Sequence, residues 1–207
     1  MLAKPVALVD MDNTLVDYEG QLLVDLNKLR SPDEPEIGVY ESWPPHVKAR
    51  ARLIKEQPGS WQNIPHFQLG WDVYNILHEL GYNIHILTKG PNNTPSAWTE
   101  KLVWCQNHIK DPDDSITITG DKSLVYGKVL VDDFPGYMDR WLKWRPRGLG
   151  IMPVHHYNEG YSHPNVLRYD GTNLEDVRRI LAIIKERKAG EEVSARDLLE
   201  AWGKSDS

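Results

Sequence analysis

Two aspartates separated by one residue, Asp10 and Asp12, are the side chains of this sequence best placed for chemistry. They directly follow an apolar run at residues 6–9, which predicts a buried strand of a parallel sheet. Ligand sites in such sheets lie just beyond the carboxyl ends of the strands. There, the first aspartate could attack phosphorus and the second could protonate the leaving oxygen. The same spacing occurs in calcium loops and ordinary turns, so the pair alone leaves these alternatives open.

A second acidic pair, Asp132 and Asp133, follows another apolar run at residues 129–131. Adjacent carboxylates are costly to hold close together without a cation, because like charges repel. A solvated loop is one interpretation of this pair. The other is that both strand ends converge on one Mg2+, a hard cation that prefers oxygen ligands.

Between the two acidic segments lie further groups that could bind phosphate. Thr88 ends an expected strand at residues 83–88, and its hydroxyl could donate to a phosphate oxygen or simply belong to a turn. Lys122 follows a strand expected at residues 115–119 and could neutralise phosphate charge. Lys128, which is closer in sequence to the acidic pair, is the alternative for that role.

These segments resemble, in chain order, the four motifs of the haloacid dehalogenase superfamily of phosphotransferases. Within that superfamily the sequence is most similar to the 5'(3')-deoxyribonucleotidases. The spacing of ten residues from Lys122 to Asp132 is also similar to that family, so it favours Lys122 over Lys128. The similar segments are residues 10–12, 58–61, 97–101, 121–123 and 130–133.

Three positions depart from the usual pattern of the deoxyribonucleotidases. Asn13 stands where the family usually has glycine, Lys89 where it has serine, and Ser60-Trp61 where it has two aromatic residues. The catalytic residues therefore carry over more directly than nucleotide specificity does. Lys89 could add a cation to the phosphate site or could face solvent.

The resemblance implies a Mg2+-dependent phosphatase that works through an aspartyl phosphate. Asp10 would be the nucleophile, and Asp12 would protonate the leaving oxygen and then activate water. Mg2+ would be held by Asp10, the backbone carbonyl of Asp12 and Asp133, with Asp132 as a neighbouring or alternative ligand. The implied phosphate-binding residues are Thr88, Lys89 and Lys122.

The resemblance also implies the substrate class, which is nucleoside monophosphates and in particular deoxyribonucleotides. Trp61 follows Pro58-Gly59 and matches a family position that lines the base pocket, so its ring could stack on a nucleobase. The alternatives are a phosphatase of sugar phosphates or of nucleic-acid ends, and a phosphate-binding regulatory module without turnover.

Composition narrows the class of partner. The chain has 207 residues, 40% hydrophobic and 26% charged, with a net charge of -6. The negative charge argues against an extended nucleic-acid partner, which needs a basic face. The single cysteine, Cys105, excludes an internal disulfide and fits a reducing cytosol. No apolar run approaches the ~20 residues that span a bilayer, so we expect a cytoplasmic protein without membrane contact, and a homodimer stays open.

The order of the expected elements predicts an α/β protein. We expect a Rossmann-like parallel sheet flanked by helices, with a small, mostly helical cap inserted after the first strand. The predicted core is residues 1–16 and 76–207, and the predicted cap is residues 17–75. Gly81 should end the helix that returns the chain to the sheet, and Trp98 and Leu102 should pack in the core beside Cys105. His155, His156 and His163 lack a convincing metal-ligand spacing.

Overall fold

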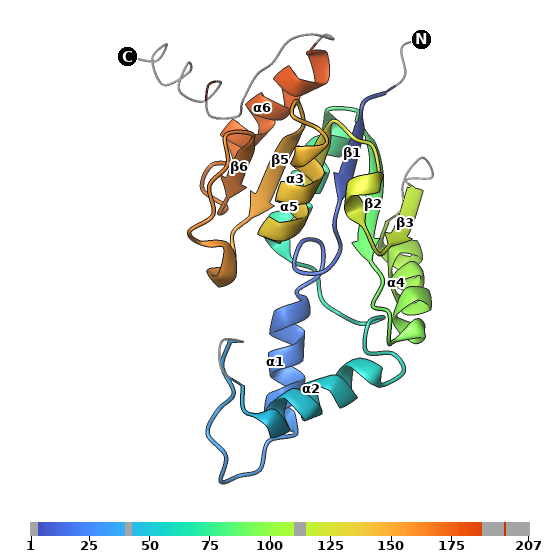
Figure 1. The fold of residues 1–207 in the computed structure, drawn as a ribbon, viewed down its shortest axis with the longest axis vertical. Helices are drawn as coiled ribbons and strands as arrows, with labels where there is room; N and C mark the ends of the chain where they lie inside the picture. Colours follow the sequence, from blue (N-terminus) through green and yellow to red (C-terminus); the bar gives the residue numbers. More distant parts are fainter. Residues whose placement is uncertain (1–3, 40–42, 110–114, 188–196, 198–207) are drawn as a thin grey trace.

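The computed structural model describes residues 4–39, 43–109, 115–187 and 197. Six parallel strands form one sheet in the order β3-β2-β1-β4-β5-β6, which confirms the predicted Rossmann-like sheet (Figure 1). Within the described ranges, no helix is both long enough and apolar enough to cross a membrane. The strands are β1 (Val6–Val9), β2 (Asn83–Lys89), β3 (Ser115–Thr119), β4 (Val129–Val131), β5 (Leu149–Pro153) and β6 (Val166–Tyr169). The helices are α1 (Tyr18–Lys28), α2 (Pro45–Glu56), α3 (Gln68–Glu79), α4 (Pro95–His108), α5 (Pro135–Lys143) and α6 (Leu174–Glu186), with short 3-10 turns η2 (Lys122–Leu124) and η3 (His156–Asn158).

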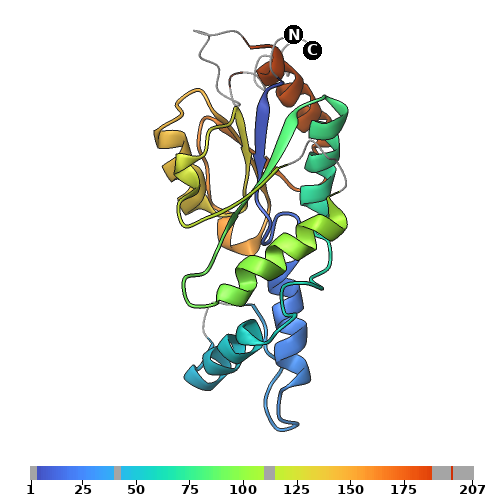
Figure 2. The same ribbon diagram turned by 90° about the vertical axis from the view of Figure 1, so that its right-hand side faces the viewer.

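Helices cover both faces of the sheet. Successive side chains of a strand point to opposite faces, and the two resulting core clusters follow this alternation. Ala7 and Val9 of β1 pack in the larger cluster, to which α3, α4 and α6 contribute. Leu8 packs on the other face with Met138 and Trp141 of α5. Figure 2 shows α5 on one side of the sheet and α3 and α6 on the other.

The strand register brings the ends of β1 and β4 to one place. Val9 of β1 pairs with Ile86 of β2 on one side and with Val131 of β4 on the other. The residues that follow these strands, Asp10 and Asp132, therefore leave the sheet at the same level. The amide of Asp10 still donates to the carbonyl of Val131 at 2.9 Å, which holds the two strand ends together.

The inserted segment after β1 contains two helices, α1 and α2, which agrees with the predicted mostly helical insertion. Figure 1 shows both helices beyond the carboxyl ends of the strands. They pack on each other rather than on the sheet, because the apolar stripe of each helix needs a partner. Their shared apolar cluster consists of Leu22, Leu26, Ile37, Trp43, Val47 and Ala51.

Helix α3 runs across the predicted boundary at residue 75. Its buried residues Val73, Ile76 and Leu77 belong to the larger core cluster of the sheet, and the helix contacts α6. The packing therefore favours an end of the inserted segment before Gln68, and the division into core and cap stays a prediction. Gly81 has φ 76 and lies just after the helix, in the left-handed region expected of a helix-ending glycine.

Two linkers connect the inserted segment to the core, the entry linker (residues 13–17) and the exit linker (residues 62–67). Two backbone hydrogen bonds join the linkers. The amide of Asp17 donates to the carbonyl of Pro65 at 2.8 Å, and the amide of Phe67 donates to the carbonyl of Leu15 at 2.9 Å. Gly70 of α3 lies against the same region. A Cβ atom there would lie 1.7 Å from the carbonyl oxygen of Thr14, so only glycine fits.

The predicted core packing of Trp98 and Leu102 in α4 is wrong. These side chains are 36% and 38% exposed, whereas Cys105 is fully buried as expected. The buried face of α4 includes Lys101 instead, which is 1% exposed. The Trp98 ring covers the loop after β2, where a Cβ atom on Gly90 would lie 2.1 Å from the ring. The helix is thus rotated so that a lysine, rather than a tryptophan, points toward the strand ends.

Candidate active site

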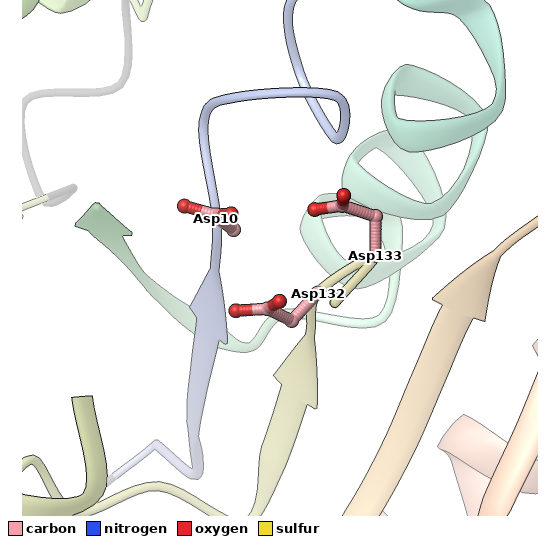
Figure 3. A group of neighbouring side chains, drawn as sticks. All are labelled: Asp10, Asp132 and Asp133. Carbon is pink, nitrogen blue, oxygen red and sulfur yellow. The ribbon is translucent and has the colours of Figure 1, made fainter. Parts of the chain in front are cut away.

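Three carboxylates meet at the carboxyl ends of β1 and β4. Asp10 follows β1, and Asp132 and Asp133 follow β4 (Figure 3). One oxygen from each carboxylate lies within 4.8 Å of the others, and all three residues are buried. The sequence-based prediction that both acidic segments converge agrees with this placement.

Lys122 lies between two of these carboxylates. Its Nζ atom is 2.6 Å from Oδ1 of Asp10 and 2.7 Å from Oδ2 of Asp132. Burial by itself lowers the pKa of Lys122, but the two carboxylates outweigh burial and raise it above its usual value. The lysine is therefore charged at neutral pH and holds Asp10 in position beside the cleft.

Lys128, the alternative lysine, has a different position. Its Nζ atom donates to backbone carbonyls at the end of α6, at 3.0 Å for Lys185 and 3.4 Å for Ile184. It stabilises the carboxyl terminus of that helix, where a cation is favourable. The structure thus places Lys122, and not Lys128, with the carboxylates.

Asp133 fits a ligand of a divalent cation. Burial first, and then repulsion by Asp132 and Asp10, raise the pKa of Asp133 well above its usual value. Within the described part of the chain, its side chain accepts hydrogen bonds from the neutral hydroxyls of Thr14 and Tyr157. One ammonium group, Lys122, thus offsets three carboxylates. A hard cation with oxygen ligands, such as Mg2+, would offset the remaining negative charge.

Asp12 does not belong to this group of three carboxylates and pairs with Lys101 instead. The Nζ atom of Lys101 is 2.5 Å from Oδ2 of Asp12. Burial raises the pKa of Asp12, and Lys101 opposes the shift only in part. The other oxygen of Asp12, Oδ1, is buried and has no hydrogen-bond partner among the described residues. A carboxyl group with a raised pKa and one unpaired oxygen suits a proton donor.

Thr88 lies beside the same lysine. It is fully buried within β2, and its hydroxyl oxygen accepts a hydrogen bond from Nζ of Lys101 at 3.1 Å. Lys101 also donates to the carbonyl of Lys89 at 2.9 Å. The side chain of Lys89 is exposed, and its Nζ atom lies 5.5 Å from the ring centre of Tyr137.

An open cleft of about 730 Å3 joins these groups to the inserted segment. Lys55 of α2 faces this cleft from the inserted segment, and burial lowers the pKa of its ammonium group, which Asp12 partly offsets. The cleft therefore combines acidic and basic groups with aromatic rings. The core side of its lining includes Asp10, Asp12, Lys89, Lys101, Lys122, Asp133, Phe134 and Tyr137, and the inserted side includes Tyr18, Lys55 and Trp61.

Trp61 lines the cleft but is more enclosed than the sequence suggests. It is 6% exposed, and its ring stacks on Tyr18 with 4.9 Å between ring centres. The Nζ atom of Lys101 lies 4.6 Å from the Trp61 ring centre. The Glu100 carboxylate accepts the backbone amides of Trp61 and Gly59, which ties the inserted segment to α4. A base that stacks on the Trp61 ring would have to displace Tyr18 or Lys101, the two side chains that lie against the ring.

Lys101 is the main site residue that sequence reasoning missed. Its segment, residues 97–101, is similar to the deoxyribonucleotidases, but the lysine has no predicted role there. The available signal was its spacing, because Lys101 shares one helical face with the buried residues Ala97, Trp104 and Cys105. A lysine on a buried face needs a charged or polar partner, and Asp12 provides one.

The sequence is similar to a family model and to individual proteins that are named as deoxyribonucleotidases. Residues 4–168 match the sequence model of the family described as "5' nucleotidase, deoxy (Pyrimidine), cytosolic type C protein". A Bordetella pertussis protein named "Putative 5'(3')-deoxyribonucleotidase" is 28% identical over 137 residues, which cover 62% of this chain and 73% of that protein. The human cytosolic-type 5'(3')-deoxyribonucleotidase is 26% identical over 139 residues, which cover 61% of this chain and 69% of the human protein.

A solved structure described as a dehalogenase has the same fold. The TM-score is 0.50 at 10% identity, and the similarity covers 88% of this chain and 99% of that one. Identity this low supports the fold alone. The match to the family model covers most of the sequence and contains every predicted site residue. The chain therefore belongs to this family of deoxyribonucleotidases, as its motifs predict.

Proposed function

We propose that this protein is a Mg2+-dependent phosphatase that hydrolyses nucleoside monophosphates, in particular deoxyribonucleotides. The observation that carries the proposal is the convergence of Asp10, Asp133 and Lys122 beside Asp12 at the ends of two neighbouring strands. A nucleophile, a metal ligand, a phosphate-neutralising cation and a proton donor thereby share one cleft. Family membership supports the same activity.

In the proposed reaction, Asp10 attacks phosphorus through a carboxylate oxygen. The bond between phosphorus and the ester oxygen breaks, and Asp12 gives a proton to the departing nucleoside oxygen. Asp12 then takes a proton from the water that attacks the aspartyl phosphate, which releases inorganic phosphate and restores Asp10. Lys122 and Thr88 hold the phosphoryl oxygens, and Lys101 keeps Asp12 in place.

The metal would be held by Asp10 and Asp133, with the backbone carbonyl of Asp12 as a further ligand and Asp132 beside them. When bound, Mg2+ supplies positive charge that reduces the repulsion between the carboxylates and the incoming phosphate oxygens. Asp132 already accepts from Lys122 and from the amide of Phe134. Its proposed part is therefore to hold Lys122 rather than to bind the cation directly.

The preference for a nucleotide rests on the aromatic pair of Tyr18 and Trp61 at the inserted side of the cleft. We propose that this pair forms a wall of the base pocket, and that Lys89 adds a cation near the phosphate. The net charge of -6 supports a small phosphate monoester over an extended nucleic acid. The human relative is of cytosolic type, which supports a cytoplasmic location for this chain. A homodimer stays a prediction.

A substrate screen tests the proposal. Phosphate release would be measured for nucleoside, deoxynucleoside and sugar monophosphates, each with Mg2+ and with EDTA. We expect Mg2+-dependent release that is fastest for deoxynucleoside monophosphates. Faster release from sugar phosphates would contradict the substrate class, and release that is unchanged by EDTA would contradict the metal dependence. No release from any monophosphate would leave a binding module as the better description.

A further inference from the structure

Four consecutive residues, 155–158, follow β5 and contact both the acidic site and the linkers of the inserted segment. The histidines among them do not belong to the carboxylate group at the strand ends. Their contacts reach Asp133 on one side and both linkers on the other. This stretch takes no part in the proposed chemistry, so its contacts need a separate explanation.

Tyr157 makes the central contact. Its hydroxyl donates a hydrogen bond to Oδ2 of Asp133 and accepts one from Nδ2 of Asn13 at 3.0 Å. The side-chain oxygen of Asn13 accepts the amide of Glu19 at 2.9 Å, in the first turn of α1. One chain of hydrogen bonds thus runs from Asp133 through Tyr157 and Asn13 to the first helix of the inserted segment.

Asn13 is suited to this position by its backbone. Its φ of 54 lies in the left-handed region, which asparagine tolerates better than most residues with a side chain. Glycine, the usual residue of the family at this place, would adopt the same backbone with less strain but could make neither side-chain hydrogen bond. The departure from glycine is therefore explained by two contacts that glycine cannot make.

The neighbours of Tyr157 reinforce the connection. His155 donates from Nε2 to the carbonyl of Asn13 at 2.7 Å, and its ring stacks on Phe67 of the exit linker at 4.6 Å. His156 Nε2 lies 3.0 Å from a carboxylate oxygen of Glu19. Asn158 donates to the backbone carbonyl of Asp133 at 2.9 Å. Each of the four residues thus contacts Asp133 or a residue at the entrance or exit of the inserted segment.

We propose that Tyr157 is a positioning residue that orients Asp133 for cation binding and, through Asn13, couples that binding to the order of the linkers. The inference rests on the proposed Mg2+ dependence. Partners that hydrogen-bond a metal ligand fix its orientation, and their loss typically weakens metal binding about 10- to 100-fold. Coupling between two sites is reciprocal, so a cation that orders Asp133 should also order the linkers.

The first test measures Mg2+ affinity by calorimetry in the 207-residue protein. Tyr157→Phe removes the hydroxyl but keeps the ring that stacks on His155. Tyr161→Phe is the matched control, because its hydroxyl also donates to a carboxylate, that of Asp139, away from the cleft. We expect Tyr157→Phe to weaken Mg2+ binding about 10-fold or more and Tyr161→Phe to leave it unchanged. Equal affinities in all three proteins would overturn the inference.

The second test measures hydrogen exchange of peptides that cover the two linkers, with and without saturating Mg2+. We expect Mg2+ to slow exchange there in the parent protein but much less in Tyr157→Phe. Asn13→Gly should bind Mg2+ within about threefold of the parent, because the contact between Tyr157 and Asp133 remains, and should lose the linker response. An equal response in all three proteins would overturn the coupling. If the parent does not bind Mg2+, the proposed metal dependence fails and this inference fails with it.

Discussion

The two sides of the cleft owe their geometry to different parts of the chain. The acidic side consists of residues that directly follow β1 and β4, so the strand register fixes their separation. The opposite side combines Lys101 of α4 with Tyr18 and Trp61 of the inserted segment, so helix packing and two linkers fix its geometry. We therefore expect the acidic side to determine whether phosphate is released, and the aromatic rings of the opposite side, Tyr18 and Trp61, to determine from which substrate. Lys101 contacts Asp12, so we expect it to affect the reaction itself.

The largest expected effect is that of Asp10→Asn. An amide has nearly the same shape as a carboxylate but cannot form the aspartyl phosphate, so kcat should fall by at least about 10,000-fold. Thermal unfolding should show no loss of stability, because one of three crowded charges is removed. Phosphate release from several nucleotides would be measured under saturating conditions. Near-normal release would show that the acidic side does not hold the nucleophile.

The next pair of variants is Lys122→Ala and Lys128→Ala. Lys122 is buried and Lys128 is half-buried, and the two lie at opposite ends of the sheet. Loss of Lys122 removes a charge-assisted contact to phosphate and should cost about 1.5 to 3 kcal/mol in kcat/KM. Loss of Lys128 should leave kcat/KM unchanged and lower the stability by about 1 kcal/mol, because it satisfies carbonyls at the end of α6. Kinetics and urea unfolding of both variants check this, and the reverse ranking would reassign the phosphate-site lysine.

Lys101→Met examines the contact between the two sides of the cleft. Methionine has a similar length but no charge, so Asp12 and Thr88 lose their shared donor. We expect kcat to fall by roughly tenfold, about 1.4 kcal/mol, for nucleotides and for a small phosphate ester alike. Loss confined to nucleotides would mean that Lys101 serves substrate selection rather than the orientation of Asp12.

Trp61→Ala and Trp61→Phe examine selectivity alone. The measured quantity is kcat/KM for a nucleotide divided by kcat/KM for a small phosphate ester. If Trp61 forms part of a base pocket, Trp61→Ala should lower this ratio by a factor that corresponds to the loss of about 1 to 3 kcal/mol of stacking free energy. Trp61→Phe retains a ring against Tyr18, so it should keep most of the ratio and the stability. An unchanged ratio in Trp61→Ala would make Trp61 a packing residue, which its low exposure also allows.

The smallest expected effect is the pH dependence of stability that His85 causes. Burial lowers the pKa of His85 below its ordinary 6.5, so the unfolded chain binds a proton more readily than the folded chain. The neutral His85 ring therefore makes its full contribution to the free energy of unfolding above pH 6.5. This contribution is lost as the pH falls from 6.5 toward the lowered pKa of the folded state. The half-exposed ring is screened by solvent, so we expect less than about 1 kcal/mol. Urea unfolding between pH 7.5 and 5.5 should show a flatter profile for His85→Gln, and an unchanged profile would exclude His85 as the cause.

The acidic side could be predicted from the sequence because its logic is local. An apolar run followed by aspartate specifies both a buried strand and the residue at its end, and parallel strands end at one edge. Asp10, Asp132 and Lys122 therefore lie close together as expected. Thr88 also lies at this edge as predicted, although β2 continues to Lys89.

The opposite side could not be predicted as well because it depends on the rotation of a helix. Trp98 and Lys101 are three residues apart in α4, and the apolar character of Trp98 suggested that it was the buried one. The ion pair with Asp12 favours the burial of Lys101 instead, and no spacing within α4 reveals a partner 89 residues away. The contacts of Asn13 with Tyr157 span 144 residues and were likewise invisible to local patterns.

The paired linkers have a consequence for how this enzyme type can diversify. Because the chain leaves the core and returns to it at neighbouring points, everything between the two linkers behaves, for the core, like one long surface loop. Such loops accept insertions and replacements far more readily than strands do. We therefore expect the substrate range to be exchangeable between relatives as one uninterrupted stretch of sequence. The reaction itself cannot be transferred in this way, because its residues come from segments scattered along the chain.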